Sequence, residues 1–195
     1  MSPENTATGR RSDAPARLFF LVGPPAVGKL SVAREIERAS GAIVVDNHLV
    51  NNAVFVPLGM GRSDEVTLAD TDALRARVLD VVLEATLAAP AELSHVFTVW
   101  LPDDPENAEH VERLRRVAQS RGVRFVPVWL SAEPEALLGR VGSPGRAERS
   151  KLTDPAILRE LLDLPPLPAP ADALTLDMTT TDPASAAAHI LDASS

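Results

Sequence analysis

The feature that most constrains this chain is a short loop framed by glycines, between an apolar run and a helical pattern. Residues 18–22 are continuously apolar, as in a strand that is buried on both faces of a sheet. The loop Gly23-Pro24-Pro25-Ala26-Val27-Gly28-Lys29 follows directly. Residues 29–39 then place apolar side chains at helical spacing, and Gly41 supplies the stop. We therefore predict a strand, a tight loop and a helix in direct succession.

Apolar runs and helical patterns alternate in the same way along the rest of the chain. Further strands are predicted over residues 42–45, 96–101, 123–130 and 174–178. Helices are predicted over residues 71–89, 104–120, 133–141, 154–162 and 183–191, the first with Leu74, Val78, Val81, Val82 and Ala85 on its apolar side. Because no hairpin signal separates the strands, this pattern indicates βαβ units, a parallel sheet and a three-layer α/β domain.

The length of 195 residues suits one domain. Residues 1–16 show no periodicity and are predicted to form a disordered tail, so the single domain is expected over residues 17–195. The proline-rich segment 165–170 is predicted to be a stiff surface loop within that domain, because a strand pattern resumes after it.

Composition excludes several classes of function. A net charge of −8 and an aromatic content of only 4% argue against binding nucleic acid through a basic or stacking surface. The chain has no cysteine, which excludes disulfides, thiolate zinc sites and cysteine nucleophiles. No apolar run approaches the ~20 residues that span a bilayer, and the first residues lack the apolar stretch of a signal peptide. We expect a cytoplasmic protein without nucleic-acid or membrane partners.

The glycine-framed loop fits the G-x-x-x-x-G-K frame of the Walker A motif. Its glycines let the backbone curl so that successive N–H groups form a nest for an anion. The helix that follows directs its positive end to the same place, and Lys29 adds a charge that can reach the β- and γ-phosphates of a nucleotide. The alternative is an ordinary turn with a surface lysine, but the strand and helix on either side are the context that the motif requires.

The residue after the Walker lysine departs from the motif. A serine or threonine hydroxyl usually helps to hold Mg²⁺ there, whereas this chain has Leu30 and places its hydroxyl on Ser31. One step along a helix turns the side chain by ~100°, so Ser31 cannot simply replace the missing ligand. Either the metal is held mainly by phosphates, water and a carboxylate, or Ser31 reaches it in an adjusted geometry. A third possibility is a protein that binds a nucleotide without catalysis.

With these motifs the chain resembles the small P-loop kinases, such as shikimate kinase, gluconate kinase, the nucleoside monophosphate kinases and chloramphenicol phosphotransferase-like proteins. The resemblance covers roughly residues 18–191. It depends on the Walker A loop, the end of the second predicted strand and an arginine-rich segment after the fourth. It implies a five-stranded parallel sheet in the order 2-3-1-4-5, a mobile lid, and a helical segment after the second strand that binds the phosphoryl acceptor. It also implies ATP and Mg²⁺.

The second predicted strand ends at Asp46, where an open α/β sheet places its ligands. In shikimate kinase-like proteins this strand ends in an Asp-x-Asp pair. Asp46 matches the first of these residues, which approaches the metal, and His48 occupies the place of the second, which contacts the attacking hydroxyl. The metal ligands are therefore expected to be Asp46 and Ser31, and either Asp46 or His48 could be the base. The alternatives are a helix cap for Asp46 and a structural role for His48. Asp103, after the third strand, is a weaker candidate for a metal contact.

A basic segment follows the fourth strand. Residues 140–151 hold four basic side chains and one acidic side chain, in a protein that is acidic as a whole. Arginines that close over a transferring phosphoryl group stabilise its charge, so residues 142–151 are predicted to be the lid. Arg140 and Arg146 are the expected catalytic arginines, and Arg140 and Arg149 are expected to contact the nucleotide. The alternative is a solvated loop whose arginines pair with surface acids.

Asn47, His48, Asn51 and Arg62 are expected to bind the acceptor, since they lie where the resembling kinases bind it. The expected reaction is the transfer of the γ-phosphate of ATP to a hydroxyl of a small molecule, with Lys29, Asp46 and His48 taking part. The alternatives are a nucleotide kinase, a P-loop NTPase, or a regulatory protein that binds nucleotide without turnover. The residues expected to bind the nucleotide in the loop are Gly23, Pro24, Pro25, Ala26, Val27, Gly28, Lys29, Leu30 and Ser31.

Overall fold

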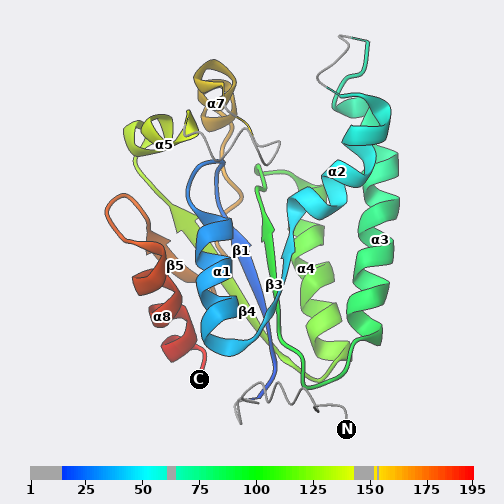
Figure 1. Ribbon diagram of the computed structural model, residues 1–195, viewed down its shortest axis with the longest axis vertical. Coiled ribbons are helices and arrows are strands. Elements are labelled where there is room, and N and C mark those ends of the chain that lie inside the picture. Colours follow the sequence, from blue (N-terminus) through cyan, green and yellow to red (C-terminus); the bar gives the residue numbers. More distant parts are fainter. Residues whose placement is uncertain (1–14, 61–64, 143–151, 153) are drawn as a thin grey trace, which may run out of the picture.

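A computed structural model describes residues 15–60, 65–142, 152 and 154–195 (Figure 1). It contains a five-stranded sheet in the order β2-β3-β1-β4-β5, and every pair of neighbouring strands is parallel. The strands are β1 (Arg17–Val22), β2 (Ile43–Asp46), β3 (His95–Val99), β4 (Arg124–Ser131) and β5 (Leu174–Asp177). The predicted fold class and strand order are confirmed.

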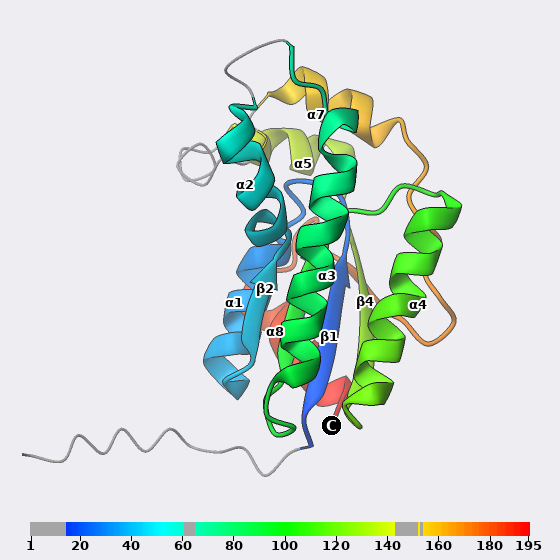
Figure 2. The same cartoon turned by 90° about the vertical axis from the view of Figure 1, so that its right-hand side faces the viewer.

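Helices cover both faces of this sheet (Figures 1 and 2). Those described are α1 (Lys29–Ser40), α2 (Asn47–Leu58), α3 (Asp72–Ala88), α4 (Pro105–Ser120), α5 (Pro134–Val141), α7 (Pro155–Leu162) and α8 (Pro183–Ala193), with a short 3-10 turn (Ala69–Thr71) before α3. Side chains of α1 and α8 pack on one face, and those of α3 and α4 pack on the other. No described helix is both long and apolar enough to cross a membrane.

The central strand β1 explains why its sequence is apolar without alternation. Phe19 and Leu21 belong to the core on the α1 and α8 side, whereas Leu18, Phe20 and Val22 belong to the core on the α4 side. All five side chains are at most 1% exposed. A strand between two helical layers has two buried faces, which explains why residues 18–22 are all apolar.

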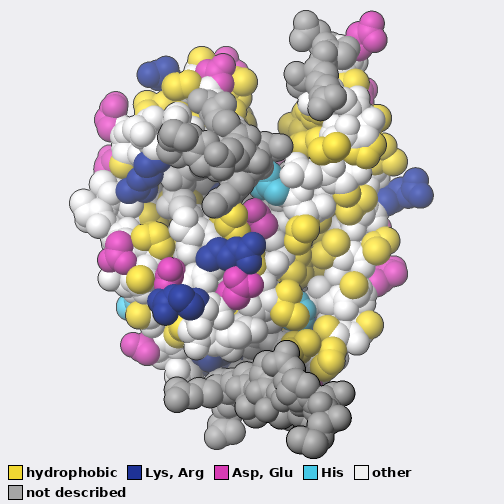
Figure 3. Space-filling model, in the orientation of Figure 1, with side chains coloured by type: hydrophobic (Ala, Val, Ile, Leu, Met, Phe, Trp, Pro, Cys, Tyr) yellow, Lys and Arg dark blue, Asp and Glu magenta, His cyan; other side chains and the backbone are white. Residues whose placement is uncertain are grey.

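Helix α3 differs from its predicted orientation. Leu74 and Val81 are 40% and 63% exposed, whereas Leu83 and Thr86 are buried. The helix is apolar on more than one side, so its periodicity could not indicate which side packs on the sheet. Apolar side chains also gather over β2 and α2, where Leu49 and Val56 are exposed (Figure 3).

The proline-rich segment is held more closely than a surface loop. Leu167 is 7% exposed and packs in the core on the α4 side. Its N–H donates to the carbonyl of Leu101 at 3.0 Å, and its carbonyl accepts the indole N–H of Trp129 at 2.9 Å. The segment therefore forms a wall beside the end of β3.

Candidate phosphate-binding site

The glycine-framed loop leaves β1 between its two neighbouring strands. The N–H of Gly23 donates to the carbonyl of Val99 on β3 at 3.2 Å. On the other side, a Cβ atom at position 23 would lie 2.4 Å from the carbonyl oxygen of Leu130 on β4. Only glycine fits this close approach, so the first glycine of the motif is required by packing.

The loop then curls into α1 through left-handed backbone. Ala26 has φ of 68°, and Gly28, which caps α1, has φ of 105°. Lys29 reaches back across the loop, and its Nζ donates to the carbonyls of Gly23 at 2.5 Å and Pro24 at 2.9 Å. The ammonium group therefore lies against the loop, beside the N-terminal end of α1, where the helix dipole also favours an anion.

A cleft of about 690 Å³ opens in front of this loop. Loop residues 25–31 form one wall, and the ends of β2 and β3 supply residues 46–48 and 98–100. Arg140, Leu152, Met178 and residues 180–183 complete the lining. The cleft thus lies at the carboxyl ends of the parallel strands, which is where sheets of this kind bind ligands.

Asp46 is fixed at the mouth of the cleft by a neighbouring strand. Thr98 on β3 donates its hydroxyl to Oδ1 of Asp46 at 2.6 Å, and Thr98 itself is 3% exposed. Asp46 stands at the N-cap position of α2, yet its side chain makes no capping hydrogen bond. Its orientation is therefore set by Thr98 and not by the helix, which leaves Oδ2 directed to His48.

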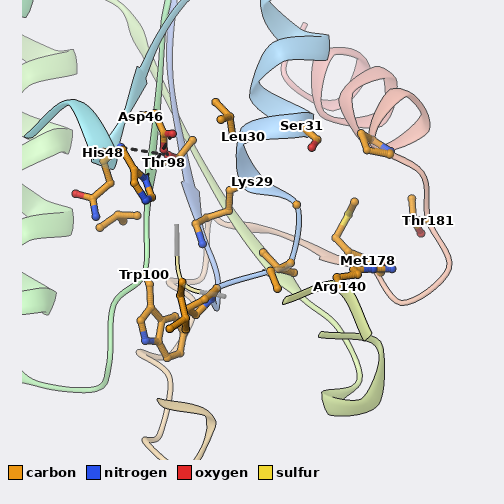
Figure 4. A pocket seen from close by; sticks show the side chains of 18 of the residues that line it. Lys29, Leu30, Ser31, Asp46, His48, Thr98, Trp100, Arg140, Met178 and Thr181 are labelled. Carbon is orange, nitrogen blue, oxygen red and sulfur yellow. Dashed lines mark hydrogen bonds and ion pairs between the residues drawn. The ribbon is translucent and has the colours of Figure 1, made fainter. Parts of the chain in front are cut away.

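His48 lies beside Asp46 on the first turn of α2 (Figure 4). Its Nδ1 is 3.6 Å from Oδ2 of Asp46, slightly beyond hydrogen-bond range. Nδ1 is buried and has no hydrogen-bond partner among the residues that the structure describes. Because Nδ1 is enclosed beside a carboxylate, a small rotation of the ring would let the Nδ1–H group donate a hydrogen bond to Asp46. Nε2 would then be the ring nitrogen that accepts hydrogen bonds.

Leu30 and Ser31 occupy different sides of α1. In Figure 4 the Leu30 side chain lies on the side facing Asp46, and the Ser31 hydroxyl points to the other side of the helix. Both residues line the cleft. No group of three or more His, Asp or Glu side chains that could hold a metal ion is found among the described residues.

Arg140, in the last turn of α5, lies on the opposite side of the cleft from Asp46, and Lys29 lies between them (Figure 4). Its guanidinium donates to the carbonyls of Met178 at 2.9 Å and Thr179 at 2.8 Å. These bonds join α5 to the segment between β5 and α8. The same segment carries Asp182, which caps α8; the hydrogen bonds from Ser185 hold the pKa of its carboxyl below the usual range.

Only some of the other predicted site residues line the cleft. The structure brings Asn47 into the cleft, whereas Asn51 is not among the lining residues, nor is Asp103. Gly23 and Pro24, the first two residues of the loop, are not among the residues that line this cleft. Arg62, Arg146 and Arg149 fall outside the described residues, as does the predicted lid after Gly142.

Sequence reasoning missed two kinds of residue at this site. Thr98 is one residue inside the end of β3, and only the pairing of β2 with β3 places it beside Asp46. Met178 and residues 180–183 follow β5, the last strand, and border the cleft because β5 ends at the same edge of the sheet. The general rule that ligands bind at the carboxyl ends of strands could have indicated the second group.

Comparison with known proteins agrees with this geometry. Residues 18–163 match the model of a family described as an AAA domain. No curated protein sequence matches the chain significantly. Three solved structures illustrate the likeness of fold: a gluconokinase from Sinorhizobium meliloti 1021, the APS kinase CysC from Mycobacterium tuberculosis and a shikimate kinase from Aquifex aeolicus.

These three structures are 18%, 21% and 16% identical to the chain, with TM-scores of 0.58, 0.56 and 0.53. The alignments cover 92%, 91% and 91% of this chain and 94%, 96% and 94% of the others. Such low identity establishes the fold and leaves the substrates open. The chain therefore belongs to the AAA domain family, and its fold is that of the small P-loop kinases.

Proposed function

We propose that the protein is a phosphotransferase that moves the γ-phosphate of ATP to a hydroxyl of a small molecule, in the cytoplasm. The observation that carries this proposal is the single cleft shared by the curled loop with Lys29 and by the pair Asp46 and His48. A phosphate on the loop and a hydroxyl beside the pair would face each other, as phosphoryl transfer requires.

The loop supplies binding and charge. The backbone N–H groups at the start of α1 would cradle the phosphates, and Lys29 would exchange its bonds with the Gly23 and Pro24 carbonyls for bonds to phosphate oxygens. That exchange places a positive charge where negative charge spreads in the transition state. Arg140 adds a second positive charge from the other side of the cleft.

The residues present fit an ion of the Mg²⁺ type. Asp46 offers a carboxylate that Thr98 already orients, whereas the Ser31 hydroxyl points to the other side of α1 (Figure 4). When bound with the nucleotide, Mg²⁺ neutralises phosphate charge. Because Leu30 provides no ligand, we assign the protein's main contribution at this ion to Asp46.

We assign to His48 the roles of orienting the acceptor and accepting its proton. With Nδ1 turned to Asp46, Nε2 becomes the basic atom on the acceptor side. Asp46 would then have two functions, since it would bind the metal and accept a hydrogen bond from His48. Asn47, which also lines the cleft, can donate to or accept from the acceptor through its amide.

A second function is favoured by one observation, the apolar Leu30 at the usual metal-ligand position. A protein that binds nucleotide without turnover would tolerate that residue. A nucleotide kinase or a P-loop NTPase would use the same loop with another acceptor, a nucleotide or water.

Turnover assays separate these functions. The protein is incubated with Mg-ATP alone and then with pools of hydroxylated metabolites, and ADP release is measured. Slow release that an acceptor accelerates supports the proposal. Fast release without an acceptor indicates an NTPase, acceleration by nucleotides alone indicates a nucleotide kinase, and tight binding without any release indicates a regulatory protein.

Two variants test whether the loop carries the activity. Lys29→Ala should abolish measurable transfer while the fold is retained, because the charge at the γ-phosphate is lost. Arg34→Ala removes a cation from the same helix at a position that is exposed and outside the cleft, so its turnover should match the unmodified protein. Near-normal turnover of Lys29→Ala would show that this loop is not the site of transfer.

A further inference from the structure

A second pocket, of about 410 Å³, lies beside the phosphate cleft. We name it the apolar chamber. It is bordered by the start of the loop at Gly23 and Pro24, by α5, by the end of α7, and by the proline-rich segment. Its larger side chains are Trp100, Trp129, Leu137, Leu162, Leu164 and Leu167. None of these side chains has a role in the phosphoryl transfer proposed for the cleft.

The lining of the apolar chamber selects strongly against charge. None of the described residues that line it is Asp, Glu, Lys, Arg or His, and only Ser131 and Thr175 carry a hydroxyl. The indole N–H of Trp129 is already bonded to the carbonyl of Leu167 at 2.9 Å. Trp129 therefore presents its ring and not its polar atom. Trp100 also lines the chamber, and its indole N–H is buried and has no hydrogen-bond partner among the described residues. The lining side chains thus offer one indole donor and two hydroxyls, so a charged or heavily hydroxylated group would lose most of its hydration there for few new hydrogen bonds.

The walls of the apolar chamber are held in place by contacts within the protein. Besides the Trp129 bond, the N–H of Asp103 donates to the carbonyl of Pro165 at 2.8 Å, and the N–H of Leu167 donates to the carbonyl of Leu101 at 3.0 Å. Pro102 and Pro166 form a β-bridge between the same two segments. These links tie the proline-rich segment to the end of β3. A preformed apolar pocket of this kind binds a ligand at a small ordering cost.

The apolar chamber adjoins the phosphate cleft at two places. Trp100 lines both pockets, and the loop borders the chamber with Gly23 and Pro24 and the cleft with residues 25–31. The two pockets are therefore neighbours that share one wall, the side chain of Trp100.

We propose that the apolar chamber binds an uncharged ring of the phosphoryl acceptor, so that the acceptor is a ring-bearing alcohol and not a polyol. This inference rests on the proposed phosphotransferase function. The ring stacks between the apolar side chains of the chamber and the rings of Trp100 and Trp129, and the hydroxyl extends toward Asp46 and His48.

Intrinsic fluorescence provides a direct test, because the only two tryptophans of the chain are the two that line the apolar chamber. The protein is titrated with 3-phenylpropan-1-ol and with glycerol, both transparent at the excitation wavelength of tryptophan. We expect 3-phenylpropan-1-ol to change the emission saturably, and glycerol to cause no saturable change. An equal response to both alcohols would overturn the inference.

The chain offers a matched pair of variants. Leu164 lines the apolar chamber and is 43% exposed, whereas Ile157 on α7 is 46% exposed and lines neither pocket. Leu164→Glu places a carboxylate at the chamber and should weaken 3-phenylpropan-1-ol binding about tenfold. Ile157→Glu makes the same change of chemistry outside and should bind as the unmodified protein does. Equal affinity in the two variants would overturn the inference.

A separate arm distinguishes this inference from the proposed function. The binding of an N-methylanthraniloyl derivative of ATP reports on the phosphate cleft. Lys29→Ala should no longer bind this derivative but should keep its affinity for 3-phenylpropan-1-ol. Failure of the unmodified protein to bind the nucleotide contradicts the phosphotransferase proposal. Failure to bind 3-phenylpropan-1-ol, in a protein that binds the nucleotide, contradicts only the assignment of the apolar chamber.

Discussion

Replacing Gly23 by alanine should test how tightly the loop is held against the sheet. The added Cβ would lie 2.4 Å from the carbonyl oxygen of Leu130, and real Cβ atoms stay at least 3.0 Å from such neighbours. That oxygen belongs to the backbone of β4, a strand paired on both sides, so it cannot move alone. The loop must move instead, together with the Gly23 carbonyl that anchors Lys29.

Overpacking of this kind in a rigid environment costs about 2 kcal/mol, which lowers the unfolding midpoint of a domain this size by roughly 6 °C. Because we propose that the loop positions the phosphates of ATP, turnover should fall further, by about a hundredfold. Calorimetry gives the midpoint, titration with a fluorescent ATP analogue gives affinity, and ADP release gives turnover.

Gly139 supplies the control. It lies within α5 and a Cβ there would meet nothing within 4 Å, so Gly139→Ala should leave turnover unchanged and raise stability by about 0.5–1 kcal/mol. A Gly23→Ala protein with unchanged midpoint, nucleotide affinity and turnover would refute the reasoning that β4 limits the position of the loop.

Three further predictions concern the cleft and the core. Asp46→Asn should raise the Mg²⁺ concentration needed for half-maximal turnover; an unchanged requirement would remove Asp46 from the metal. Arg140→Ala should lower kcat about a hundredfold and affect ATP affinity less, whereas the reverse ratio would place Arg140 on the bound nucleotide alone. Burial lowers the pKa of His95 and of His110 to about 4. As the pH drops, these histidines therefore bind protons in the unfolded chain at a higher pH than in the folded protein. The free energy of unfolding then falls between pH 6.5 and 4, by about 2 kcal/mol per histidine at pH 5. Urea unfolding at pH 7.5 and 5 should show this loss reduced in His110→Gln and unchanged in the exposed control His189→Gln.

Local sequence determined where the elements of this protein begin and what order they take. Asp104 and Asp154 each accept a backbone N–H at the start of a helix whose first residue is proline, as their dipeptides predict. The strand, loop and helix around the Walker frame also follow from neighbouring residues. Since these contacts join residues only a few positions apart, the pattern of side chains along the chain is sufficient to predict them. Repeated βαβ units then indicate the parallel sheet.

Tertiary structure decided which residues meet at the carboxyl edge of that sheet. Thr98 orients Asp46 across 52 positions of sequence, and the register of β2 on β3 alone brings them together. The apolar chamber likewise depends on the proline-rich segment lying along the end of β3, and the buried side of α3 depends on which neighbours it meets. Each of these contacts joins segments that are distant in sequence. Several apolar or polar residues could have been the partner in each case, so the sequence pattern could not select one. Sequence by itself therefore predicted the phosphate loop and the acid that faces it, while only the packed sheet decided how that acid is held and what lies beside the loop.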